Sequence, residues 1–226
     1  MNRSRSWRRE RLRRALLYLC TDRRAARGDL ERFLEAVLAG GVDIVQLRDK
    51  DASQPQLRDA AATFSAACRR HAALFILNDD PRLAAEVDAD GVHVGQDDPP
   101  PDHARTLVGP DRLIGRSTHN IAQIDRALTE DCDMFTVGPV SATPTKEGRP
   151  GVGLGPLRHA AAVGRDRPWF VSGGMAAETA PPVLAAGGRR LVVVRALTQA
   201  SDPRAASAEL SALLGRSADH TGDRRR

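Results

Sequence analysis

The chain has 226 residues, 41 % of them hydrophobic, which suffices for one substantial core and predicts a single domain. Its formal charge of +5 arises at the ends, because residues 1–14 contain seven arginines and one glutamate and residues 224–226 are three arginines. The body between them keeps 24 of the 34 basic and 28 of the 29 acidic residues, and only 4 % of the chain is aromatic, which argues against a nucleic-acid partner.

The cysteines Cys20, Cys68 and Cys132 are odd in number, far apart and in apolar surroundings. They predict buried reduced thiols rather than a disulfide framework or a zinc site. Residues 1–14 have arginine where a signal peptide needs an apolar core, and no run approaches about 18 apolar residues. We therefore expect a cytoplasmic protein without a membrane partner.

Eight short apolar runs bounded by turn residues follow one another along the chain, and each predicts a strand. The segments between them have helical spacing, as in residues 30–38 and 57–71. Strand then helix, repeated eight times, predicts an α/β fold of the (β/α)₈ TIM-barrel type, although an open doubly wound sheet shares this periodicity. The predicted strands are residues 16–20, 43–47, 74–77, 91–94, 113–115, 134–137, 169–171 and 191–194.

The barrel domain is predicted to span residues 15–215. Residues 1–14 and 216–226 carry charge without an apolar face, which predicts disordered extensions. Helix starts are indicated by Asp29, Asp80 and Asn120, each able to accept hydrogen bonds from the first backbone N–H groups of a helix.

The second predicted strand ends in the polar series Gln46, Leu47, Arg48, Asp49 and Lys50. Strand alternation places Gln46, Arg48 and Lys50 on one side, facing the barrel interior. Two cations and an amide there favour an anionic ligand such as a pyrophosphate. A salt bridge at the rim between Arg48 and Asp49 is the alternative.

Acidic residues end the next two strands, in residues 78–80 and 96–98. Parallel neighbours bring such groups together, and Mg²⁺ prefers a few carboxylates with room for water and phosphate oxygens. Asp80 and Asp98 also precede prolines, so each fits an N-cap equally well.

The fifth strand ends in hydroxyl groups, within residues 115–119, and a long connection follows the sixth. Residues 140–155 contain four glycines and two prolines without apolar periodicity, which favours a mobile lid over substrate rather than disordered surface. Its hydroxyls and Lys146 are candidate phosphate contacts, and a flexible ammonium can neutralise a departing diphosphate, although exposed lysines are common.

Two glycines, Gly173 and Gly174, follow the seventh strand and allow backbone N–H groups to approach an anion. Arg195 ends the eighth strand and either reinforces that site or pairs with an acidic neighbour. His93 lies inside an apolar strand and is interpreted as a core residue rather than a metal ligand. Without a nucleophile motif, the chemistry points to transfer driven by departure of a phosphate group.

In this order the clusters resemble those of the thiamine-phosphate synthase family, from about residue 16 to residue 208. The resemblance implies a transferase that condenses 4-amino-2-methyl-5-hydroxymethylpyrimidine diphosphate with 4-methyl-5-(2-hydroxyethyl)thiazole phosphate, giving thiamine phosphate and pyrophosphate. The matching segments are residues 46–50, 77–80, 91–98, 115–117, 138–139, 143–146 and 173–174.

The resemblance also implies roles for individual residues, with Mg²⁺ on Asp79 and Asp98. Pyrophosphate departs, the aminopyrimidine stabilises the methylene cation and the thiazole nitrogen captures it, without a protein nucleophile. The implied ligands of the pyrimidine diphosphate are Gln46, Asn78 and the catalytic residues Arg48, Lys50, Ser117 and Lys146. Those of the thiazole phosphate are Thr143, Pro144, Thr145, Gly174, Val194 and Arg195.

Ser141, Ala142 and Ser172 depart from the family pattern and bear on lid packing and the shape of the thiazole site. A thiazole tautomerase-like isomerase on the same barrel is the nearest rival, but it needs no diphosphate site. A second rival is a nucleic-acid-binding protein that uses the basic arm, and its function would be lost on deletion of residues 1–14. The synthase interpretation instead predicts near-normal turnover after that deletion. A homo-oligomer is compatible with the sequence.

Overall fold

Eight parallel strands form one closed barrel in the computed structural model, which describes residues 3–143 and 150–215. The TIM-barrel prediction is therefore confirmed, and the open sheet is excluded. The strands are β1 (Leu17–Thr21), β2 (Ile44–Leu47), β3 (Leu74–Asn78), β4 (Gly91–Val94), β5 (Leu113–Thr118), β6 (Met134–Val137), β7 (Trp169–Val171) and β8 (Leu191–Val193).

The fifth strand differs most from its prediction, because it continues for three polar residues beyond the apolar run. Arg116, Ser117 and Thr118 pair in register with Phe135, Thr136 and Val137 of β6. Backbone pairing across the sheet extends the strand where hydrophobicity alone ends it.

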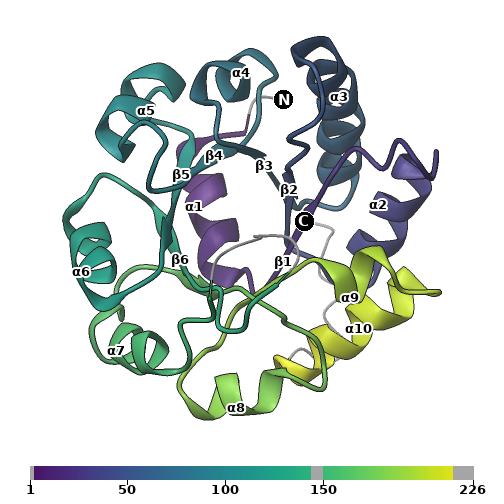
Figure 1. The fold of residues 1–226 in the computed structure, drawn as a ribbon. Helices are drawn as coiled ribbons and strands as arrows, with labels where there is room; N and C mark the ends of the chain where they lie inside the picture. Colours follow the sequence, from purple (N-terminus) through teal and green to yellow (C-terminus); the bar gives the residue numbers. More distant parts are fainter. Residues whose placement is uncertain (1–2, 144–149, 216–226) are drawn as a thin grey trace.

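The helices surround the barrel, except for α1, which crosses its middle in projection (Figure 1). Asp80 and Asn120 cap α4 and α6 as predicted, accepting from the N–H groups of Leu83 and Gln123. Asp29 precedes α2 but instead accepts two hydrogen bonds from Arg24. The helices are α1 (Arg5–Arg14), α2 (Leu30–Ala39), α3 (Gln54–Arg70), α4 (Pro81–Glu86), α5 (Pro101–Val108), α6 (Ile121–Thr129), α7 (Gly155–Val163), α8 (Ala180–Ala185), α9 (Arg195–Thr198) and α10 (Pro203–Leu213).

Two apolar clusters hold the fold together, one between the strands and the outer helices and one inside the barrel. Strand alternation divides them: Val45 and Leu47 face the helices, whereas Ile44 points into the barrel. The three cysteines are buried thiols, as predicted. Within the described part of the chain, no helix has the length and apolarity needed to cross a membrane.

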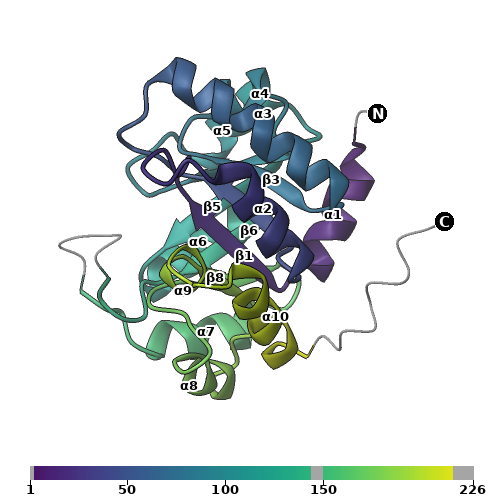
Figure 2. The same ribbon diagram turned by 90° about the vertical axis from the view of Figure 1, so that its right-hand side faces the viewer.

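The basic N-terminal arm is a helix, which corrects the prediction that residues 1–14 are disordered. Helix α1 lies at the end of the barrel where the strands begin (Figure 2). Leu12 and Ala15 are buried in the interior cluster, and Trp7 packs against it. The helix therefore closes the floor of the barrel.

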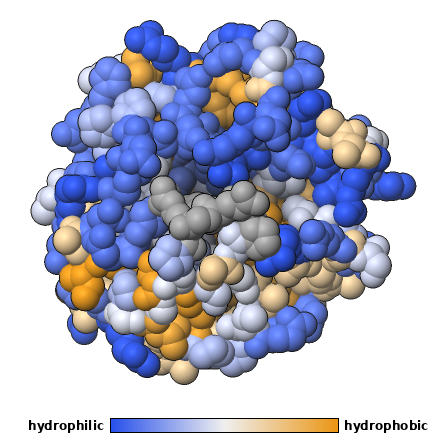
Figure 3. Space-filling view, in the orientation of Figure 1, coloured by the Kyte–Doolittle hydropathy of each residue, from blue (hydrophilic) through white to orange (hydrophobic). Residues whose placement is uncertain are grey.

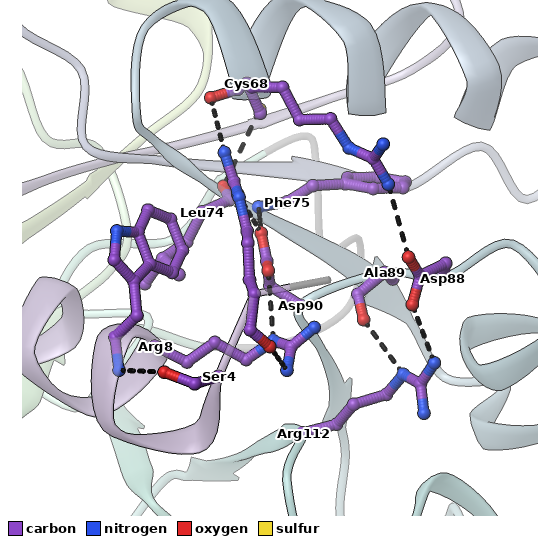
Figure 4. Close-up of polar contacts among 12 residues, drawn as sticks. Ser4, Arg8, Cys68, Leu74, Phe75, Asp88, Ala89, Asp90 and Arg112 are labelled. Carbon is purple, nitrogen blue, oxygen red and sulfur yellow. Dashed lines mark hydrogen bonds and ion pairs between the residues drawn. The ribbon is translucent and has the colours of Figure 1, made fainter. Parts of the chain in front are cut away.

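Arginines anchor α1 to aspartates that directly precede strands. Arg8 Nε lies 3.0 Å and Arg3 Nη1 lies 2.5 Å from the carboxylate oxygens of Asp90 (Figure 4). Arg9 Nη2 lies 3.0 Å from Asp133. Asp90 is only 3 % exposed and also accepts a hydrogen bond from the N–H group of Phe75. Three of the seven arginines in residues 1–14 are thus paired with buried aspartate side chains.

Candidate active site

A cavity of about 860 Å³ opens at the carboxyl ends of the strands. It brings together residues that are remote in the sequence, as the barrel prediction requires. Pro144, Thr145 and Lys146 lie outside the described residues. The predicted site residues that line the cavity are Gln46, Arg48, Lys50, Asn78, Asp79, Asp98, Ser117, Thr143, Gly174, Val194 and Arg195.

Arg48 and Lys50 supply positive charge to the cavity. The alternative salt bridge between Arg48 and Asp49 is not formed, because Asp49 pairs with Arg23 at 3.1 Å. Among the residues the structure describes, neither Arg48 nor Lys50 has an ion-pair partner within 4.0 Å. Both charges are therefore available to an anionic ligand.

Asp79 and Asp98 face each other on the same side of the cavity. Burial, reinforced by a hydrogen bond and charge repulsion from Asp98, raises the pKa of Asp79 to about 6. Asp98 does not cap a helix, since α5 begins after Pro100, and its Oδ2 instead accepts from the N–H group of Gly95 at 2.6 Å. Two carboxylates this close repel each other unless a proton or a cation lies between them.

The floor of the cavity contains residues that the sequence analysis assigned to the core or did not consider. His93 is buried, and its Nε2 lies 3.0 Å from Ser117 Oγ. The ring of Tyr18 meets His93 edge to face at 6.5 Å. A Cβ atom at Gly115 would lie 2.3 Å from His93 Nδ1, so a glycine is needed there.

Strand alternation could have identified these floor residues. Cys20 pairs in register with Gln46, and Asn78 pairs with His93, so Cys20 and His93 point to the same side of the sheet as these two predicted site residues. The apolar neighbours of His93 indicate a core position, whereas its register places it beside Asn78 at the cavity.

The opposite half of the cavity is more apolar and is built from the segments after β7 and β8. Gly173 and Gly174 have φ values of 104° and 75°, a conformation that favours glycine. A Cβ atom at Gly173 would lie 2.4 Å from the backbone nitrogen of Val140. Apolar residues likewise gather over the α7 and α8 side of this face, and hydrophilic ones over the α3 to α5 side (Figure 3). The apolar lining includes Met175, Ala176, Ala177, Val192, Val194 and Ala196.

A parallel barrel with cations, paired acids and glycine turns around one mouth defines an enzyme that acts on small phosphorylated molecules. The family model described as thiamine monophosphate synthase matches residues 17–197. The thiamine-phosphate synthase of Mycolicibacterium vanbaalenii is 52 % identical over 209 residues, covering 88 % of this chain and 94 % of that protein. That of Thermobifida fusca is 52 % identical over 208 residues, covering 91 % and 95 %.

Solved structures agree with these relatives. A thiamine phosphate pyrophosphorylase from Pyrococcus furiosus has a TM-score of 0.79 and 29 % identity, covering 91 % of this chain and 96 % of that one. The chain belongs to the thiamine monophosphate synthase family. It is a transferase that forms thiamine phosphate in the condensation step of thiamine biosynthesis, which confirms the function implied by the resemblance.

Proposed function

We propose that the two halves of the cavity bind the two substrates. The charged half, with Arg48 and Lys50, takes the pyrimidine diphosphate, and the glycine turns with the apolar lining take the thiazole phosphate. The proposal rests on two cations, Arg48 and Lys50, that have no ion-pair partner among the described residues. They lie beside two crowded acids in the cavity that Gly173 and Gly174 also line. Gln46, Asn78 and Ser117 complete the first half.

Asp79 and Asp98 would hold Mg²⁺. The residues fit this ion, because two carboxylates leave coordination positions for water and diphosphate oxygens. In the described ranges, no group of three or more His, Cys, Asp or Glu side chains is arranged to hold a metal, which disfavours a closed protein cage. When bound, Mg²⁺ would neutralise negative charge on the diphosphate.

The side chains of this protein then need to bind, orient and exclude water. Arg48 and Lys50 would stabilise charge that develops on the departing diphosphate, and Lys146 is proposed to add to it from the connection after β6. Thr143, Pro144, Thr145 and Gly174, with the backbone of Val194 and Arg195, would fix the thiazole phosphate. The apolar half would keep water from trapping the carbocation before the thiazole nitrogen attacks.

The proposal extends to location and partners. Three buried thiols in a biosynthetic enzyme fit the reducing cytoplasm. Arg3, Arg8 and Arg9 already pair with Asp90 and Asp133, which supports small molecules rather than nucleic acid as the partners. A homo-oligomer stays compatible with these observations.

The test of the proposed function is direct turnover. The purified protein is incubated with both phosphorylated substrates, with and without Mg²⁺, and pyrophosphate and thiamine phosphate are measured. We expect equal amounts of both products and dependence on Mg²⁺. Pyrophosphate without thiamine phosphate would indicate hydrolysis, and no product at all would refute the proposal.

Asp98→Asn is expected to raise the Mg²⁺ concentration needed for half-maximal turnover by about tenfold or more. The amide keeps the size of the side chain and one oxygen for the Gly95 N–H group, so the melting temperature should change little. Titrating Mg²⁺ in the turnover assay, alongside a melting curve, gives both values. A loss of thermal stability with an unchanged Mg²⁺ requirement would assign Asp98 a structural role only.

Mg²⁺ affinity is expected to fall below pH 6, by up to about tenfold per pH unit, because a proton on Asp79 competes with the cation. In Asp79→Asn this dependence should disappear. Without metal the sign is opposite for folding: since the folded pKa lies above the ordinary 3.8, this group favours the folded state at low pH, and that contribution is lost as the pH rises through 6. Calorimetric titration between pH 5 and 8 checks the first expectation, and a flat wild-type profile would contradict it.

A further inference from the structure

Arg116 is a charged residue of β5 that the proposed chemistry does not use, although it lies next to Ser117. It is 4 % exposed and does not line the cavity, because strand alternation turns it away from the barrel interior. Burying a guanidinium is costly unless its donors are satisfied. The partners of Arg116 therefore show what it stabilises.

Arg116 makes a two-pronged ion pair and one backbone contact. Its Nε and Nη2 lie 3.1 and 3.4 Å from the two carboxylate oxygens of Glu130. Its Nη1 donates to the carbonyl oxygen of Gly95, the residue that follows β4. Glu130 thus fixes the plane of the guanidinium, and the guanidinium fixes the carbonyl of Gly95.

The N–H group of Gly95 faces a residue of the proposed metal site. Its N–H group donates to Asp98 Oδ2 at 2.6 Å. Gly95 is therefore held from both directions, by Arg116 at its carbonyl and by the Asp98 carboxylate at its nitrogen. A rotation of the backbone at this residue would move Asp98 away from Asp79.

A second branch of the same cluster reaches Ser117. Arg126 lies 3.3 Å from Glu130 and donates to the side-chain oxygen of Gln96. The amide nitrogen of Gln96 donates at 2.5 Å to the backbone oxygen of Ser117. The segment after β4 is consequently tied to β5 through Gln96, which Arg126 and Glu130 support by charge-assisted contacts.

We propose that Arg116, paired with Glu130, is a positioning residue that holds Asp98 in the geometry needed for cation binding. The inference rests on the proposed Mg²⁺ site. Partners that orient a metal ligand commonly affect metal affinity by about 10- to 100-fold. Arg116 is expected to act in this way without touching substrate or metal.

The experiment compares Arg116→Met with Arg105→Met. Arg105 is a matched control, because it also pairs with two acidic oxygens, on Asp131 and Asp133 at 3.1 and 2.7 Å, and donates to loop carbonyls. Its carbonyl contacts precede β5 and its acidic partners precede β6, and none of these residues lines the cavity. Both variants should lose thermal stability, so melting temperature alone cannot distinguish them.

Two measurements distinguish them. Hydrogen exchange of the Gly95 amide in metal-free protein should be about tenfold faster in Arg116→Met and unchanged in Arg105→Met. The Mg²⁺ dissociation constant, measured by titrating metal alone, should rise about tenfold in Arg116→Met only. In Arg116→Lys, the single ammonium group cannot contact Glu130 and the Gly95 carbonyl as the guanidinium does. Both its exchange rate and its Mg²⁺ dissociation constant should lie between those of wild type and Arg116→Met.

The outcomes separate this inference from the proposed function. Wild-type protein that binds no Mg²⁺ would overturn the metal site and, with it, the inference. Wild-type binding that Arg116→Met leaves unchanged would overturn the inference alone. If Arg116→Met does not fold, Glu130→Gln removes the charge but keeps the shape, and the same two measurements on it decide the question.

Discussion

Arg48→Ala is expected to lower kcat/KM for the pyrimidine diphosphate by roughly 30- to 1,000-fold, which corresponds to about 2–4 kcal/mol of transition-state stabilisation. The guanidinium has no ion-pair partner among the residues described, so removing it leaves no buried acid uncompensated. The melting temperature should therefore stay close to that of wild type. Steady-state kinetics and a thermal melt measure the two effects.

The control is Arg82→Ala, which removes an exposed arginine of α4. It should leave both values unchanged. Lys146→Ala is expected to resemble Arg48→Ala, since it also removes a charge proposed to face the diphosphate. Wild-type kinetics in Arg48→Ala would remove this residue from the site, and a fall in melting temperature would point to a structural role.

Deleting residues 1–14 is expected to lower the free energy of unfolding by about 5 kcal/mol or more, and the melting temperature by about 10 °C or more. The deletion removes both arginines from Asp90, which is 3 % exposed, and an uncompensated buried charge costs about 3–5 kcal/mol. Removing Leu12 exposes the interior cluster and adds about 2 kcal/mol. Turnover should fail on warming well before the wild-type enzyme does.

This expectation replaces the near-normal turnover that follows from a disordered arm. Arg8→Ala should reproduce part of the loss, whereas Arg5→Ala, at an exposed position of the same helix, should not. Chemical denaturation gives the free energies. A truncated protein that melts and turns over like wild type would show that α1 is dispensable.

The strands and the mouth of the barrel could be predicted because both depend on local pattern. Parallel strands are buried on both faces, so they appear in the sequence as apolar runs. Polar residues begin where the strand leaves the buried part of the sheet. The same pattern places Gln46, Arg48 and Asp79 at the mouth of the barrel, where they line the cavity. The predicted end of β5, at Gly115, is too early. The strand continues because Ser117 pairs with Thr136 of β6, a contact that a local pattern does not indicate.

The N-terminal arm differs from its prediction for a related reason. Seven arginines in 14 residues predict a solvated segment unless acidic residues elsewhere in the fold pair with them. Those acids are Asp90 and Asp133, which lie far along the chain. One sign was present in the sequence: Trp7 and Leu12 give the helix an apolar contact with the barrel. Two apolar residues are too few to stand out against that much charge.

The floor helix also bears on how the chain is made. Arg190, just before β8, donates to the backbone oxygens of Arg13 and Ala15 at 3.2 and 3.0 Å, which joins the start of the polypeptide to its last strand. During synthesis, α1 can therefore contact all of its neighbours only after residue 190 has left the ribosome. A nascent fragment that stops short of residue 190 lacks β8, so the apolar cluster inside the barrel stays partly exposed to water.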